Sequence, residues 1–188
     1  MKIPILHLLF LFTTLSLKGQ YGSITPHQMD SLTQVVATTK IDTAKHDALF
    51  WLGIATQFNN PYASENYFNE ALRLARKIDH KDRILGDLVT LGFLYGNIGE
   101  PAKGIDLLLE AVQRIEGSKQ HDDPSMAYAF LAYNYEAQGD FENAIDYARR
   151  SYLFYEKRLK DKSGIDNLDE RGYPAGPMRM GQLFEKMG

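Results

Sequence analysis

The chain has 188 residues, 44% of them hydrophobic and 24% charged, a balance that is typical of globular proteins and excludes disordered and collagen-like chains. Its 21 basic and 24 acidic residues give a net charge of -3, so it has no positive field of the kind that gathers nucleic acid. The absence of cysteine excludes a disulfide framework, a thiolate nucleophile, a cysteine-ligated zinc site and a lipidated N-terminal cysteine. We therefore expect a fold held by packing, and no nucleic-acid partner.

The first residues have the pattern of an export signal. Lys2 gives a positive start, residues 3–17 are almost wholly apolar, and Lys18 and Gly19 follow. The apolar run is shorter than the about 20 residues that span a bilayer, which makes an uncleaved anchor the weaker alternative. We predict a signal peptide over 1–19 and a mature chain that is exported to the periplasm or the extracellular space and is not inserted in the membrane.

Seven helices are predicted along the rest of the chain, because apolar residues recur three and four positions apart and a helix breaker separates the two helices of each repeated pair. The first is expected at 26–38, where Thr25 and Gln28 can form a capping box and Pro26 occupies the first helical position. The other six are expected at 43–58, 61–78, 83–98, 101–116, 125–138 and 141–159. The fold class is therefore all-α.

An internal repeat organises the last six of these helices. Gly53, Gly92 and Ala132 occupy the same position in three copies, and the copies are 39 and 40 residues apart. We expect the two helices of each pair to cross closely at these small residues. The signature residues of the repeat are Leu52, Gly53, Leu91, Gly92, Tyr95, Leu131, Ala132, Tyr135, Gly139 and Ala144.

The repeated Leu-Gly-x-x-Tyr pattern, the turn Gly139-Asp140-Phe141, and the small residues Ala144 and Ser151 resemble the tetratricopeptide repeat. The resemblance covers residues 43–159 and implies a right-handed α-solenoid of antiparallel helix pairs. The period is longer than the about 34 residues usual in that family, as in exported and regulatory bacterial members. The alternative two-helix repeat of similar length, the HEAT type, lacks both the Leu-Gly-x-x-Tyr and the Gly-Asp-Phe patterns.

The sequence divides into four parts. They are a signal peptide (1–19), an N-terminal capping helix region (20–42), three repeats (43–165), and an irregular segment with an incomplete fourth repeat (166–188).

The fourth repeat is expected to start at Pro177, with Gly181 in the place of Gly92 and Ala132. The alternative small residue, Gly172, keeps a period of 40, but its helix would pass through Pro177 and a second proline.

No catalytic, cofactor or metal site is predicted. The five histidines have no ligand spacing, and His80 and His121, which occupy equivalent turns, more often stand in such turns without binding a metal. The motifs of serine nucleophiles, of dinucleotide binding and of phosphate-binding loops are absent from the sequence. We therefore expect a protein that is not an enzyme.

The first helix of each pair is expected to line the concave side of the stack. Aromatic side chains on that side suit a helical or extended peptide, because a ring buries a large area at a small entropy cost. The alternative is that these rings pack between neighbouring repeats. Family members that grip a C-terminal carboxylate use Lys, Arg and Asn there, where this chain has Ile54, Phe93 and Tyr133. The candidate groove residues are Phe50, Phe58, Val89, Phe93, Met126 and Tyr133.

The sequence thus predicts a non-enzymatic scaffold that binds a protein or peptide outside the cytoplasm. An alternative is the extracytoplasmic input region of a longer signalling protein, a sensor kinase or a transcription regulator, of which this chain would be a fragment. Glycan capture is a third class, and its outer-membrane members usually begin with the lipidated cysteine that this chain lacks.

Overall fold

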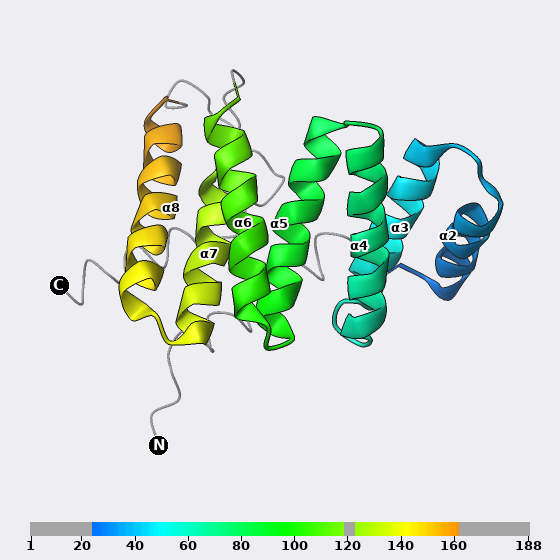
Figure 1. Cartoon of the computed structure of the whole chain (residues 1–188), viewed down its shortest axis with the longest axis horizontal. Coiled ribbons are helices and arrows are strands. Elements are labelled where there is room, and N and C mark those ends of the chain that lie inside the picture. The colour runs from blue at the N-terminus through cyan, green and yellow to red at the C-terminus, as the bar shows by residue number, and fades with distance from the viewer. Residues whose placement is uncertain (1–23, 119–122, 162–188) are drawn as a thin grey trace.

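The computed structural model describes residues 24–118 and 123–161, and within these ranges the chain forms seven helices and no strand (Figure 1). The predicted ranges are confirmed, with ends that differ by two residues at most. The predicted signal peptide and the incomplete fourth repeat lie outside the described residues. The helices are α2 (Pro26–Thr38), α3 (Asp42–Thr56), α4 (Pro61–Lys77), α5 (Lys81–Asn97), α6 (Pro101–Glu116), α7 (Ser125–Gln138) and α8 (Phe141–Asp161).

The helices stand side by side in one row, with α2 at one end and α8 at the other (Figure 1). Each packs on the next one along the chain, and α5 also packs on α7. Because contacts run between neighbours, the interior is extended along the row instead of gathered around one centre. The fold is therefore the expected all-α solenoid of antiparallel helix pairs, in which α3, α5 and α7 are the first helices and α4, α6 and α8 the second.

Local sequence signals set the ends of the helices. The capping box before α2 is present, with the N–H of Gln28 donating to Thr25 Oγ1 at 3.3 Å and the N–H of Thr25 donating to Gln28 Oε1 at 2.8 Å. Gly99 and Gly139 adopt φ values of 82° and 85° just after α5 and α7, a left-handed conformation that stops a helix at little cost for glycine. Asp79 does the same after α4 with a φ of 50°.

The second helix approaches the first most closely at the glycines of the repeat. A Cβ atom at Gly53 would lie 2.5 Å from Cε1 of the Phe68 ring, and one at Gly92 would overlap the side chain of Leu108. No carbon–carbon contact is that short, so any side chain at either glycine would push the pair apart. The predicted crossing points are confirmed in the first two repeats.

The third repeat reaches the same fit with other residues. Ala132 stands in the place of the glycines, and Ala148 stands in the place of Phe68 and Leu108. Both alanines are buried. The glycine and the large side chain of the first two repeats are thus replaced by two alanines, which put a small side chain on both helices of the third pair.

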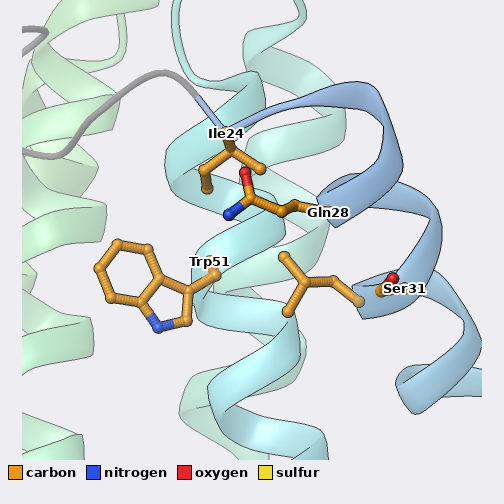
Figure 2. A pocket seen from close by; sticks show the side chains of 5 residues that line it. Ile24, Gln28, Ser31 and Trp51 are labelled. Atoms are coloured by element: carbon orange, nitrogen blue, oxygen red, sulfur yellow. The ribbon is translucent and has the colours of Figure 1, made fainter.

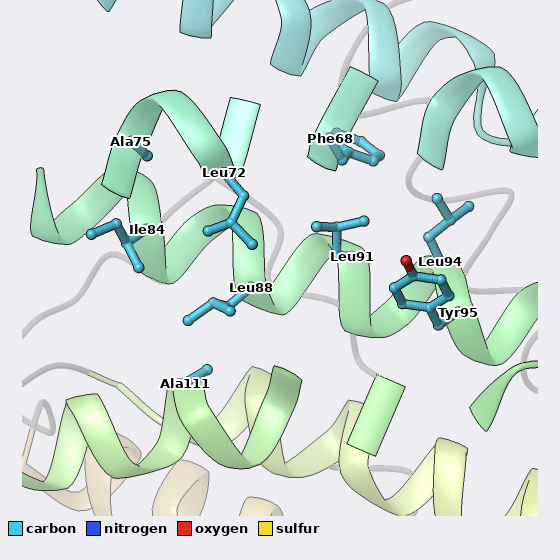
Figure 3. Packing of buried hydrophobic residues seen from close by; sticks show 9 residues of the cluster. All are labelled: Phe68, Leu72, Ala75, Ile84, Leu88, Leu91, Leu94, Tyr95 and Ala111. Atoms are coloured by element: carbon cyan, nitrogen blue, oxygen red, sulfur yellow. The ribbon is translucent and has the colours of Figure 1, made fainter. Parts of the chain in front are cut away.

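The core runs on from one repeat to the next. Figure 3 shows side chains of α4 meeting those of α5, with Ala111 of α6 on the other side of α5. A second cluster joins α6 to α7, and Val89 of α5 packs against both clusters. The signature leucines of all three repeats are buried. The first cluster consists of Phe68, Leu72, Ala75, Ile84, Leu88, Leu91, Leu94, Tyr95 and Ala111.

A backbone carbonyl at each glycine crossing accepts a side-chain hydrogen bond, but from different donors. In the first repeat Ser64 Oγ donates to the carbonyl of Gly53 at 2.9 Å. Gly104 stands in the place of Ser64 in the second repeat, and the carbonyl of Gly92 accepts at 3.1 Å from Asn134 Nδ2 of α7. A Cβ atom at Gly104 would overlap the Asn134 amide. Because Gly104 has no side chain, Asn134 of the third repeat has room to contact the backbone of the second repeat.

A buried polar cluster joins α3 to α5. His46 Nε2 lies 2.8 Å from Asp87 Oδ2, and both side chains are buried. His46 Nδ1 lies 3.0 Å from Asp47 Oδ1, and Arg83 Nη2 donates to Asp47 Oδ2 at 2.9 Å. The contact between His46 and Asp87, which are 41 residues apart in the sequence, links the two helices and favours this alignment of the two repeats.

Burial and charge act in opposite directions on this cluster. Burial disfavours the charged form of His46, but the hydrogen bonds and charges of Asp87 and Asp47 outweigh it and raise the pKa of His46 above its ordinary 6.5. Burial raises the pKa of Asp87, against the opposing effect of His46. The hydrogen bond from Arg83 lowers the pKa of Asp47. The folded protein therefore holds a proton on His46 more tightly than the unfolded chain does.

We predict that the crossing volumes are coupled. Leu108→Ala should lower the free energy of unfolding by about 2–5 kcal/mol, because it empties the space beside Gly92. Adding Gly92→Ala should recover about 1 kcal/mol or more, because the new methyl enters that space and a helical glycine is removed. In the presence of Leu108, Gly92→Ala should destabilise the protein. Urea unfolding followed by circular dichroism measures all four proteins, and an equal effect of Gly92→Ala in both backgrounds would contradict the assigned crossing.

We predict that stability falls as the pH rises past neutrality. The pKa of His46 is higher in the folded state, so its contribution is complete below 6.5 and is lost as the pH rises through the folded pKa. The melting temperature measured between pH 6 and pH 9 should therefore decline. His46→Gln keeps a donor for Asp87 but cannot titrate, and should flatten this part of the curve. His27→Gln, on the exposed side of α2, is the matched control and should leave the slope unchanged.

Candidate peptide-binding surface

The sides of α3, α5 and α7 that are turned away from α4, α6 and α8 form the first-helix face. The spacing of the repeats assigns equivalent positions on it, because 39 residues separate the first two copies and 40 the next two. Its middle rows consist of Trp51, Thr90 and Phe130, then Ile54, Phe93 and Tyr133, then Asn97 and Ala137 with Phe58 in the turn just after α3.

The six predicted groove residues differ widely in exposure. Phe58 and Met126 expose 42% and 38% of their surface. Phe50 and Val89 are half-buried and pack against the core cluster of α4 and α5. Tyr133 is half-buried, and Phe93 retains only 5% of its surface.

Phe93 and Phe50 pack between helices instead of lining an open groove. The Phe93 ring lies 4.7 Å from that of Phe130 and 6.4 Å from that of Tyr133, both on α7. The Phe50 ring meets the Phe68 ring of α4 edge-on at 5.6 Å. Aromatic pairs at these distances stabilise the contact between helices. Fewer of the predicted groove residues are therefore available to a bound molecule than if all six were exposed on the first-helix face.

Hydrogen bonds lie beside the aromatic contacts between α5 and α7. Tyr133 Oη donates to Asn97 Oδ1 at 3.2 Å, and Asn97 Nδ2 donates to the carbonyl of Phe93 at 3.1 Å. Burial raises the pKa of Tyr133, and the charge of Glu136 adds to the rise, so the phenol keeps its proton at neutral pH. The relative positions of α5 and α7 on this face are thus held by both packing and polar contacts.

Trp51 is the residue of this face that sequence reasoning missed. It is the only tryptophan of the chain and exposes 37% of its surface. Its indole borders a cavity of about 370 Å³ between α2 and α3, together with Ile24, Gln28, Ser31 and Leu32 (Figure 2). The signal for it was available, because Trp51 is equivalent to Thr90 and Phe130 in the repeat.

Basic side chains are scarce on the first helices. Lys45, Lys81 and Arg83 all lie near the starts of α3 and α5, and α7 carries neither Lys nor Arg. Arg83 is paired with Asp47. The rows around Phe58 and Tyr133 therefore present aromatic, amide and hydroxyl groups to a bound molecule. These rows contain no Lys or Arg that could form an ion pair with the C-terminal carboxylate of a peptide.

The histidines do not make a reactive site in the described part of the chain. Both ring nitrogens of His46 are engaged and the ring is buried, so it is not accessible to a bound molecule. His121 lies outside the described residues, so its relation to His80 is not described. Within residues 24–118 and 123–161, no three His, Asp or Glu side chains gather as metal ligands do. None of the helices described is both long and apolar enough to span a bilayer.

Comparison with known proteins identifies the repeat. The family model of the tetratricopeptide repeat matches residues 83–157, which hold all of α6 and α7 and most of α5 and α8. The crystal structure of a protein named MamA has the same fold, with a TM-score of 0.52 and 20% sequence identity over 76% of this chain and 68% of that chain. No curated protein matches the chain in sequence. Repeats of this kind typically build non-catalytic scaffolds for protein–protein interaction. Residues 83–157 therefore carry tetratricopeptide repeats, and the described helices form an all-α solenoid of the same type.

Proposed function

We propose that this protein is a non-enzymatic scaffold that binds a peptide segment of a protein partner on its first-helix face. The observation that carries the proposal is the partial exposure there of three large apolar side chains: Trp51 on α3, Phe58 in the turn after α3, and Met126 on α7. Large apolar side chains gathered on one exposed face mark interaction sites in many proteins, and a few such residues can carry most of the binding energy. A fold of packed helices holds them in place, so little entropy is lost on binding.

The chemistry of the face selects a class of peptide. Apolar and aromatic side chains of a partner can pack against Phe58 and Met126. Thr90 and Asn97 are on α5, the first helix of the second repeat, which comes between α3 and α7 in the chain. Because no cation stands in these rows, the peptide is bound through apolar residues along its length and not through a terminal carboxylate. Both a helix and an extended strand present such residues on one side.

The protein acts outside the cytoplasm in this proposal. Support comes from the sequence, in which Lys2 precedes an apolar run over residues 3–17 and a short polar stretch follows. Export is also compatible with a chain that has no cysteine, because no disulfide can form in an oxidising compartment.

The peptide-binding proposal predicts that binding depends on the first-helix face. Peptides selected from a displayed random library on the wild-type protein should carry apolar anchors and should change the fluorescence of Trp51, the only tryptophan. Phe58→Glu and Met126→Glu should each weaken binding about tenfold or more, or about 1.4 kcal/mol, because a buried contact becomes an unpaired charge.

Matched controls lie on the second helices. Leu109→Glu on α6 changes a side chain whose exposed fraction, 37%, is similar to that of Met126. Tyr62→Glu on α4 changes an exposed aromatic ring, as Phe58→Glu does. Both should leave binding unchanged. If no peptide is enriched, or if the control variants weaken binding as much as the others, the first-helix face is not the binding surface.

The export proposal predicts a processed N-terminus. Expression of the full chain in a Gram-negative host, followed by fractionation, should place the protein outside the cytoplasm with Gln20 as its first residue. Replacing two leucines of the apolar run, Leu8→Asp and Leu9→Asp, should retain the protein in the cytoplasm. An unprocessed wild-type chain in the cytoplasm would contradict the proposal.

A further inference from the structure

Each second helix that has a neighbour after it packs on the next first helix. Phe68 and Leu72 of α4 form one core cluster with Leu88 of α5, and Leu108 and Val112 of α6 form another with residues of α7. The same stripe of each second helix therefore serves two contacts, one with its own partner and one with the following repeat.

The corresponding stripe of α8 is open to solvent. Ile105 of α6 is 7% exposed under α7, whereas its equivalent on α8, Ile145, is 49% exposed. Phe141, one turn earlier on the same side of α8, is 63% exposed. Ala148, which faces α7 across the third crossing, is buried as expected. Ile145 therefore stands at the position that contacts the following helix in α6, and Phe141 extends this side of α8 by one turn.

The sequence after α8 contains a segment that matches such a helix. Met180 and Gly181 repeat the pattern of Leu131 and Ala132, and Phe184 then falls in the place of Tyr135. Apolar residues at 180, 183, 184 and 187 lie three and four positions apart, which places them on one side of a helix. In the sequence, 15 residues separate Asp161 from Pro177, whereas eight separate Glu116 from Ser125.

We propose that residues 177–187 of this chain cover the α8 stripe of Phe141 and Ile145, as the first helix of a fourth repeat. Burial of the two side chains drives the contact, and Gly181 allows the next close approach. The occupant is the chain's own segment because it supplies the repeat's register and is tethered to α8, which gives it a high effective concentration. The inference concerns the α8 end and stands independently of peptide binding on the first-helix face.

Cross-linking between two introduced cysteines tests the contact, and the chain has no cysteine of its own to interfere. The test pair is Ile145→Cys with Phe184→Cys in the full chain, treated with a short bismaleimide and mapped by mass spectrometry of the digest. The reference pair is Ile105→Cys with Tyr135→Cys, equivalent residues in one cluster of α6 and α7. The test pair should cross-link within one chain at a rate close to that of the reference pair.

A control pair separates docking from mere tethering. Ile145→Cys with Lys186→Cys places the second thiol two residues further on, on the opposite side of the expected helix. It should react about tenfold more slowly than the test pair, because tethering alone makes both pairs equally available. Equal rates for the two pairs would overturn the proposal. So would a cross-link formed mainly between chains and increasing with protein concentration, since a second copy would then cover the stripe.

Discussion

The architecture depends on the close crossing of two helices at a small residue. Three consecutive pairs repeat it, and without it the helices of a pair would separate by the width of a side chain. Gly53 and Gly92 leave the whole space to Phe68 and Leu108, whereas Ala132 shares it with Ala148. What the three crossings share is a small residue on the first helix, whereas the residue in the opposite position changes from Phe to Leu to Ala. The same crossing sets which side of each first helix stays outward.

Each contact between neighbouring repeats contains a different buried polar interaction. His46 and Asp87 join the first repeat to the second, and Asn134 joins the third to the second through the carbonyl of Gly92. Asp87 stands where the other copies have alanine, so an apolar residue at this position is compatible with the fold. Buried polar pairs of this kind often add less to stability than apolar packing does. Their effect here is to favour one alignment of neighbouring repeats over others shifted along the stack.

The helices and their order followed from the sequence because their causes are local. Capping by Thr25, turn glycines such as Gly139, and apolar residues three and four apart act over a few residues, and the repeat supplied three independent copies of the pattern. The first-helix face was harder to predict. Phe93 and Phe58 are equally apolar in the sequence, yet one is buried by α7 and the other is 42% exposed, because exposure depends on which ring the neighbouring repeat supplies.

The sequence by itself thus determined the helices and their pairing, since periodicity, caps and small residues are written in short stretches of chain. Only the tertiary structure decided that Phe93 packs against Phe130, that Trp51 borders the cavity beside α2, and that His46 meets Asp87. Each of these pairs residues from different helices, and the angle and offset between helices come from packing along the whole interface. No short stretch of the chain carries that information.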